Sequence, residues 1–109
     1  QKKLGIGVDS NQNYLFPGSV LTSVVVRVDN AAYIALTAAR RGNWQNQVRV
    51  MGLQEKGVDL AFDHHNEALI SAKLKQEIDH IRSEIILGKI NLSDYTQTGT
   101  CLFNGKELF

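Results

Sequence analysis

The valine-rich segment at residues 20–28 constrains the fold more than any other part of the sequence. It contains five valines, together with Thr22 and Ser23. Because β-branched side chains are restricted in a helix and pack well on a pleated surface, this density favours an extended backbone. The segment therefore predicts a β-strand.

Shorter apolar runs on both sides predict further strands. Residues 4–8 are apolar and end at the polar stretch 9–13, which predicts a buried strand followed by a loop. Two more strands are predicted later in the chain, at residues 47–53 and 58–62, with a turn at residues 54–57 between them.

The segment after the valine-rich strand has the spacing of a helix. Asp29 is expected to cap a helix that begins at Asn30, where alanines and a leucine recur on one face. Gly42 follows the last apolar position and suits the left-handed conformation just past a helix end. So many alanines indicate close packing against a flat neighbour.

A second helix is predicted near the end of the apolar pattern. Large aliphatic residues recur every three or four positions between Ile70 and Ile85, which is the spacing of one helix face. Ser71 is a plausible cap for its first turn, and Gly88 is expected to stop it. Strands that alternate with helices indicate an α/β fold, with a layered, mostly parallel sheet and flanking helices.

Asp9 is the first candidate for ligand binding. Sheets of this kind bind ligands beyond the carboxyl ends of their strands, and Asp9 directly follows a predicted strand. A carboxylate there can accept two hydrogen bonds from the vicinal hydroxyls of a sugar. The alternative is that Asp9 only stabilises its own turn, and the pattern does not choose between the two.

The charge balance argues against nucleic acid as a partner. Twelve Lys and Arg residues nearly cancel eleven Asp and Glu residues, which leaves a formal net charge of +1. Such a chain lacks the field that attracts nucleic acid or an anionic membrane. The length of 109 residues is that of one domain, and the single cysteine, Cys101, excludes an internal disulfide.

The sequence offers neither a metal site nor a catalytic centre. Residues 63–67 (DHHNE) include metal-binding side chains, but adjacent residues rarely converge on one ion, so we expect a loop there. Gly5 and Gly7 lack the third glycine of a dinucleotide-binding motif, and we expect no cofactor. Because no nucleophile, base and orienting group can be assembled, we expect a protein that is not an enzyme.

Several segments together resemble one family. The matching segments, in chain order, are residues 6–12 (IGVDSNQ), 17–23 (PGSVLTS), 27–31 (RVDNA), 52–58 (GLQEKGV) and 86–90 (ILGKI). With these motifs the chain resembles the basic membrane lipoproteins, which are substrate-binding lipoproteins of ABC transporters. Well-studied members bind purine nucleosides.

The resemblance implies a fold, a ligand class and a location. The fold is the two-lobed, type I periplasmic binding protein fold, of which residues 1–92 resemble a carboxyl-terminal portion with pieces of both lobes. Residues 93–109 are then a carboxyl-terminal tail. The implied function is binding of a small polar ligand, such as a purine nucleoside, by closure of two lobes. The implied partner is an ABC permease, and the implied location is the cell envelope, as a membrane-anchored or periplasmic lipoprotein; the chain shows no signal segment.

Two ligand-binding positions follow from the resemblance. Asp9 matches the aspartate expected to hold ribose hydroxyls in the family. Val26 falls where the family pattern Thr-Ser-x-x-Lys-Arg-Val-Asp has a lysine, which is another expected ligand contact. This chain therefore lacks that ammonium group, and nucleoside binding is expected to be weaker.

A second hypothesis belongs to a different functional class. It is a ligand-independent interaction or regulatory module of the same fold. A lobe that is incomplete leaves strand edges and apolar faces uncovered, and these favour self-association. The sequence is therefore also compatible with a homo-oligomer that forms through exposed strands.

Overall fold

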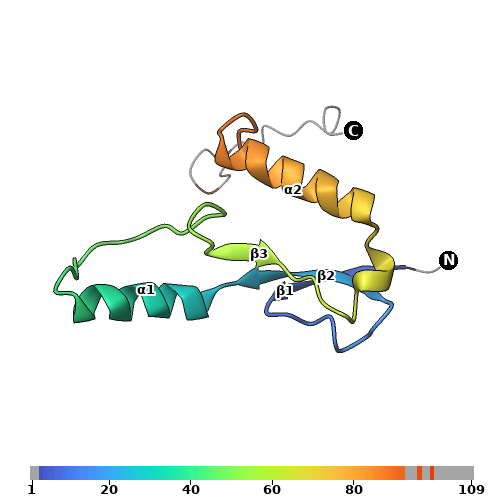
Figure 1. The fold of residues 1–109 in the computed structure, drawn as a ribbon, viewed down its shortest axis with the longest axis horizontal. Helices are drawn as coiled ribbons and strands as arrows, with labels where there is room; N and C mark the ends of the chain where they lie inside the picture. Colours follow the sequence, from blue (N-terminus) through green and yellow to red (C-terminus); the bar gives the residue numbers. More distant parts are fainter. Residues whose placement is uncertain (1–2, 93–95, 97–98, 100–109) are drawn as a thin grey trace. The chain divides into compact units, whose positions relative to one another are not determined.

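The computed structural model describes residues 3–92, 96 and 99. The chain divides into two compact units, Gln1–Gln76 and Glu77–Phe109. Its elements, in chain order, are β1 (Gly5–Asp9), β2 (Val20–Val26), α1 (Val28–Arg40), β3 (Val58–Leu60), a 3-10 helix (Glu67–Leu69) and α2 (Ala72–Ile86) (Figure 1). Cys101 lies outside the described residues, as does most of the tail predicted at 93–109.

The sheet of the first unit has three strands in the order β1-β2-β3. β1 and β2 are parallel, with Asp9 beside Val25, whereas β3 is antiparallel to β2, with Val58 beside Val26. The α/β class is thus confirmed, and the sheet combines one parallel pair with one antiparallel pair. Because of these directions, the carboxyl ends of β1 and β2 and the start of β3 lie at one edge of the sheet. We call this edge, marked by Asp9, Val26 and Val58, the Asp9 edge.

The valine-rich strand is present but shorter than predicted. β2 ends at Val26 because Val28 already belongs to α1. The strands predicted at residues 4–8 and 58–62 are confirmed by β1 and β3, with small shifts of their ends. The burial predicted for the first of them is wrong, because Ile6 and Val8 are 59% and 61% exposed. Strand formation here follows the local apolar pattern.

The first helix begins earlier than predicted, and its expected cap is wrong. α1 starts at Val28 with Arg27 in the N-cap position, and no side chain makes a capping hydrogen bond. Asp29 lies in the first helical turn, where its negative charge suits the helix dipole. Its carboxylate accepts hydrogen bonds from Arg27 instead. The predicted end is confirmed, since Gly42 has φ +71° just after Arg41.

The strand predicted at residues 47–53 is wrong. In the structure this stretch joins no sheet, and Val48 and Val50 are 95% and 86% exposed. Alternating valines favour an extended backbone, but a strand also needs a neighbour to which it can hydrogen-bond. Within the described residues no strand pairs with this segment. The turn predicted at residues 54–57 is confirmed by the backbone bond from Gly57 N–H to the Gly52 carbonyl, 2.9 Å.

The second helix agrees with its sequence signals. α2 spans Ala72–Ile86, and the Ser71 hydroxyl accepts a hydrogen bond from the Leu74 N–H at 3.1 Å. Gly88 has φ +72° two residues after the helix ends. The cap and the stop expected from sequence are therefore both confirmed. Neither described helix has the length and hydrophobicity that a membrane span requires.

The link between β1 and β2 is unusual because it contains no helix. Parallel strands are normally joined by a crossover of a dozen or more residues, most often helical. Here residues 10–19 make the connection and are attached to the sheet by a buried polar contact. The Ser23 hydroxyl donates to the Asn13 side-chain carbonyl at 2.8 Å, and the Gln12 N–H donates to the Ser23 hydroxyl at 2.9 Å.

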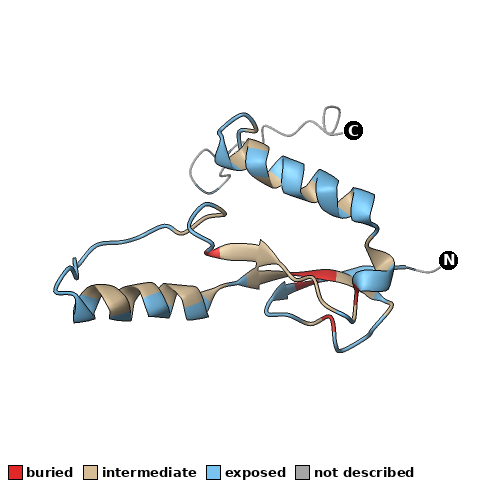
Figure 2. Ribbon diagram, in the orientation of Figure 1, coloured by how far each residue is buried: buried red, intermediate tan, exposed pale blue. Residues whose placement is uncertain are grey.

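The interior of the first unit is polar. Among the described residues no hydrophobic side chain is fully buried, whereas Asn13, Ser23 and Asn66 are 0% exposed (Figure 2). Every buried side-chain nitrogen and oxygen described has a hydrogen-bond partner. Satisfied polar groups thus occupy the place where a hydrophobic core would be expected.

Gly7 tests how tightly the link is packed on the sheet. An alanine Cβ at this position would lie 2.6 Å from the Ser23 Oγ and 3.0 Å from the Gln12 Cβ. We expect Gly7→Ala to lower the free energy of unfolding by about 1–3 kcal/mol, because Ser23 is held by two hydrogen bonds. Gly5→Ala is the matched control, since its Cβ would lie 4.0 Å from its nearest neighbour. Urea unfolding followed by circular dichroism measures both, and equal stability of the two variants would contradict the prediction.

Candidate functional site

Asp9 occupies an unusual position at the end of β1. Its φ is +80°, and Asp9 and Lys56 are the described residues other than glycine with positive φ. This backbone region is disfavoured for residues with a side chain, although aspartate tolerates it better than most. Asp9 is exposed at the edge where parallel strands end. Both the strain and the position are features of binding residues in α/β sheets.

Val26 lies at the same edge as Asp9. Asp9 is beside Val25 in the parallel register, so Val26 is the next residue along the neighbouring strand. Its side chain is 45% exposed and has no polar atom with which to hold a ligand. The structure therefore brings together the two positions that the sequence analysis selected. Their part in ligand binding stays a prediction.

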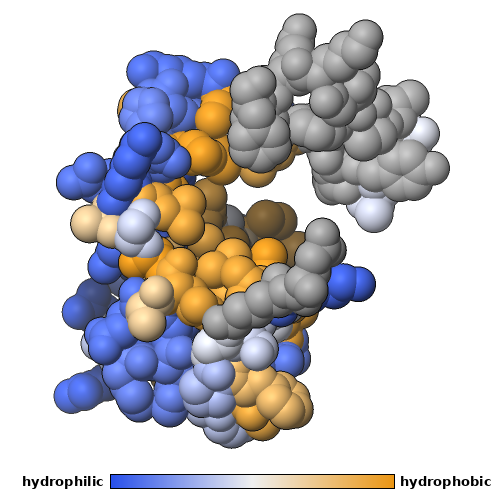
Figure 3. Space-filling view, turned by 90° about the vertical axis from the view of Figure 1, so that its right-hand side faces the viewer, coloured by the Kyte–Doolittle hydropathy of each residue, from blue (hydrophilic) through white to orange (hydrophobic). Residues whose placement is uncertain are grey.

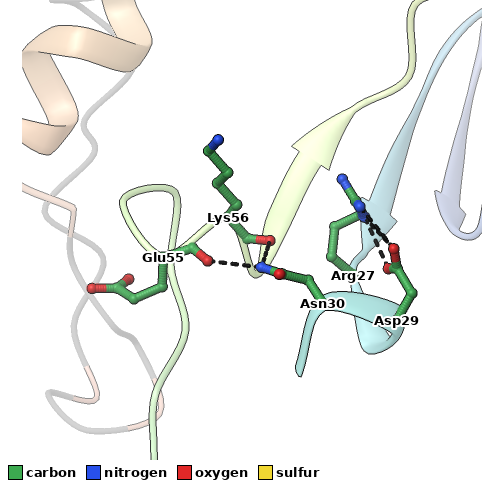
Figure 4. Close-up of polar contacts among 5 residues, drawn as sticks. All are labelled: Arg27, Asp29, Asn30, Glu55 and Lys56. Atoms are coloured by element: carbon green, nitrogen blue, oxygen red, sulfur yellow. Dashed lines mark hydrogen bonds and ion pairs between the residues drawn. The ribbon is translucent and has the colours of Figure 1, made fainter. Parts of the chain in front are cut away.

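An ion pair follows directly after Val26. The Arg27 Nη2 lies 2.7 Å from the Asp29 Oδ2, and the Arg27 Nε lies 2.9 Å from the Asp29 Oδ1 (Figure 4). This two-point hydrogen bonding lowers the pKa of Asp29 to about 2 and raises the pKa of Arg27. Sequence reasoning missed the pair because it treated Asp29 as a helix cap. The Arg-x-Asp spacing at a strand-to-helix junction was the available signal.

Asn30 attaches the turn before β3 to the start of α1. Its side-chain nitrogen donates to the carbonyl oxygens of Glu55 and Lys56 at 3.0 and 3.1 Å (Figure 4). The Arg27 N–H also donates to the Gly57 carbonyl at 2.8 Å. The strand end, the helix start and the turn are thus joined at the Asp9 edge. These hydrogen bonds hold the backbone in place where β2 ends and β3 begins.

The loop at residues 63–67 is organised by Asp63. Its Oδ2 accepts hydrogen bonds from the side-chain nitrogens of Asn11 at 2.8 Å and Asn13 at 3.1 Å, and its Oδ1 accepts one from the His65 N–H at 2.8 Å. The bond from Asn11 is the largest cause that keeps the pKa of Asp63 below its ordinary value, and the bonds from His65 and Asn13 lower it further. Asp63 is therefore a charged acceptor that ties this loop to the loop after β1.

The same loop holds the residues that the sequence analysis considered as metal ligands. Asp63, His64 and His65 each place one potential ligand atom within 4.8 Å of the others. The Asp63 oxygens already accept three hydrogen bonds, and the rings of His64 and His65 lie with their centroids 3.8 Å apart and their planes tilted by 42°. The backbone of this loop forms a hydrogen-bonded turn, and the absence of a metal there stays a prediction.

Three hollows of the first unit are lined by residues other than Asp9 and Val26. One of about 160 Å³ is lined by Ile34, Ala35 and Ala38 of α1 together with Trp44 and Met51. Neither this hollow nor those beside Phe62 and Tyr33 includes a residue of the Asp9 edge in its lining. Asp9 itself is exposed, so its carboxylate is accessible to solvent in the described chain.

Comparison with known proteins decides the family. Residues 1–96 match the Bmp family, described as ABC transporter substrate-binding protein, PnrA-like. The chain belongs to this family. Membership confirms the resemblance to basic membrane lipoproteins and places the chain in a class of transporter substrate-binding proteins that is not an enzyme class.

A solved structure shares the fold of this Bmp family member. It is the crystal structure of solute-binding proteins of an ABC transporter system from Aeropyrum pernix K1, with a TM-score of 0.64 and 21% sequence identity. The likeness covers 83% of this chain and 32% of that one, so the chain spans about a third of its neighbour's length. It confirms the periplasmic binding protein type of fold. No curated protein matches the chain significantly.

The Arg27–Asp29 pair makes a titration prediction. We expect the Asp29 carboxyl group to titrate at about pH 2 in the folded protein, against 3.8 for an unperturbed group. Because the folded pKa is the lower one, the pair stabilises the fold above pH 3.8, and this contribution is lost as the pH falls towards 2. Carboxyl ¹³C NMR titration measures the value.

The control separates the ion pair from general effects of charge. Arg27→Gln removes the partner and should return the Asp29 pKa towards 3.8. Arg40→Gln removes an equal charge from the last turn of α1 and should leave the Asp29 pKa unchanged. An Asp29 pKa that is the same in wild type and Arg27→Gln would show that the pair does not form in solution.

Proposed function

We propose that this chain is part of the solute-binding receptor of an ABC transporter and that its Asp9 edge contributes to binding a nucleoside-like ligand. Family membership over residues 1–96 supports the receptor. The observation that carries the ligand site is the exposed Asp9 carboxylate, held with φ +80° at the carboxyl end of a parallel strand. Such a carboxylate can accept two hydrogen bonds from vicinal hydroxyls of ribose.

The proposed receptor is larger than the described chain. Residues 1–92 would supply pieces of both lobes and residues 93–109 a carboxyl-terminal tail. The exposure of Asp9 supports this, because a ligand there would be enclosed only when a second surface closes over it. The closed form would then be recognised by an ABC permease. Extracytoplasmic location, as an envelope lipoprotein, is part of the same proposal and follows from the family.

Val26 sets the proposed receptor apart from the nucleoside-binding pattern. A lysine at this position would offer an ammonium group with three donors at the Asp9 edge. A hydrogen bond to a charged group contributes about 1.5–3 kcal/mol. Without it, ribose binding would weaken by roughly tenfold to over a hundredfold. The ligand would therefore be a nucleoside bound weakly, or a polar solute that does not need this contact.

Two substitutions test the ligand site in opposite directions. In the complete receptor that contains this sequence, Asp9→Ala should lower affinity for a purine nucleoside by at least about tenfold, because charged hydrogen bonds are lost. Val26→Lys should raise that affinity by about tenfold or more, because it restores the ammonium group. Isothermal titration calorimetry measures both, with Asp79→Asn on α2 as a control that should change nothing.

The possible outcomes test the ligand assignment and the receptor function separately. Heat with another solute but with no purine nucleoside would exclude nucleosides and leave the receptor standing. Unchanged affinity in Val26→Lys would remove Val26 from the site. Unchanged affinity in Asp9→Ala would remove the Asp9 edge altogether.

The uncovered apolar surface supports a second candidate, a module that self-associates through exposed strands. Ile6 and Val8 of the edge strand β1 are 59% and 61% exposed. Hydrophobic residues appear as extensive orange surface in Figure 3. An edge strand with apolar side chains is a template for pairing with another chain. On this hypothesis the ligand has no role.

Light scattering coupled to size exclusion tests self-association. If the module pairs through β1, the 109-residue chain elutes as a dimer or larger species at micromolar concentration, and Ile6→Thr with Val8→Thr shifts it to the monomer. The matched control, Val48→Thr with Val50→Thr, removes exposed valines outside the sheet and should leave the mass unchanged. A wild-type monomer across this concentration range would count against the module.

A further inference from the structure

Asp63 connects two loops that lie far apart in the sequence. The loop after β1 reaches it through Asn11 and Asn13, whose side-chain nitrogens donate to one carboxylate oxygen at 2.8 and 3.1 Å. These partners are separated from Asp63 by 52 and 50 positions. One charged side chain thus holds two residues, Asn11 and Asn13, of the loop that follows Asp9.

Asp63 is itself held firmly on the sheet. Its N–H donates to the Asn66 side-chain oxygen at 2.9 Å. Asn66 is 0% exposed, and its side-chain nitrogen donates to the carbonyl oxygens of Leu21 and Ala61, both at 2.9 Å. Because Leu21 belongs to β2 and Ala61 follows β3, Asn66 ties the Asp63 backbone to both strands.

The restraint extends back towards Asp9. The Gln12 side chain donates to the Val8 carbonyl at 2.8 Å, and its N–H donates to the Ser23 hydroxyl at 2.9 Å. The Asn13 N–H donates to the Asn11 side-chain oxygen at 3.0 Å. Val8, just before Asp9, is therefore joined to Gln12, three residues after Asp9, and the loop has little freedom to release the positive φ at Asp9.

We propose that Asp63 is a positioning residue for ligand binding: by holding Asn11 and Asn13, it keeps the backbone at Asp9 left-handed and so directs the Asp9 carboxylate towards the ligand. Asp63 does not itself contact the ligand. The inference rests on the proposed function, in which Asp9 binds the ligand. It gives the acidic and histidine-rich loop a role that needs no metal.

A double-mutant cycle in the complete receptor tests the proposal. Asp63→Asn places an amide nitrogen where two donors now find an acceptor, and it should weaken guanosine binding by about tenfold. In the Asp9→Ala background the same substitution should cause no further loss, because the residue that it positions is gone. An equal loss in both backgrounds would show that Asp63 contributes only to general structure and would overturn the proposal.

A second measurement does not depend on the ligand. In a receptor labelled with ¹⁵N at aspartate, the Asp9 amide shift and its N–H to Hα coupling report the φ angle. Asp63→Asn should move both, whereas Asp79→Asn should move neither. An unchanged Asp9 signal in Asp63→Asn would overturn the proposal even if guanosine does not bind.

The remaining variants separate the possible failures. If Asp63→Asn does not fold, Asn11→Ala removes only the exposed 2.8 Å bond and the contact to Asn13, and the same cycle and the same Asp9 signal decide. If Asp9→Ala leaves guanosine binding unchanged, the proposed function fails. If Asp9→Ala weakens binding but the cycle shows no coupling, the positioning role alone fails.

Discussion

The hydrogen bond between Ser23 and Asn13 is the contact on which the sheet of this protein depends. It is buried, it measures 2.8 Å, and it attaches a ten-residue link without a helix to the strand that the link must reach. An unpaired polar group at this depth would cost about 1–3 kcal/mol, so each partner requires the other. Gly7 leaves the space in which the contact forms. The parallel arrangement of β1 and β2, and with it the Asp9 edge, follows from this packing.

Sequence patterns predicted those elements whose signals are local. The valines of β2, the aliphatic spacing of α2 and the glycines after both helices act within a few residues, and the structure confirms them. The strand predicted at residues 47–53 failed because a strand exists only beside a neighbour, and valines at positions 48 and 50 carry no information about that neighbour. The cap at Asp29 failed because Arg27 competes for the same carboxylate.

Only the part of the candidate site that has a local sequence signal was predictable. Asp9 stands out because it ends an apolar strand, and its position at the sheet edge agrees with that rule. The role of Asp63 was not visible, since its partners Asn11 and Asn13 are about half the chain away. The family match, and a fold shared with about a third of a solved neighbour's length, add what the local patterns lack: the class of protein to which the chain belongs.

The backbone at Asp9 has a consequence for the balance between stability and function. A left-handed conformation costs an ordinary residue about 1 kcal/mol, and glycine would adopt it without that cost. A glycine at position 9 would therefore fold at least as well, with the same link and the same strand pairing. The chain instead carries a side chain whose only addition is a carboxylate at an exposed edge. Selection for stability alone would not be expected to keep it there.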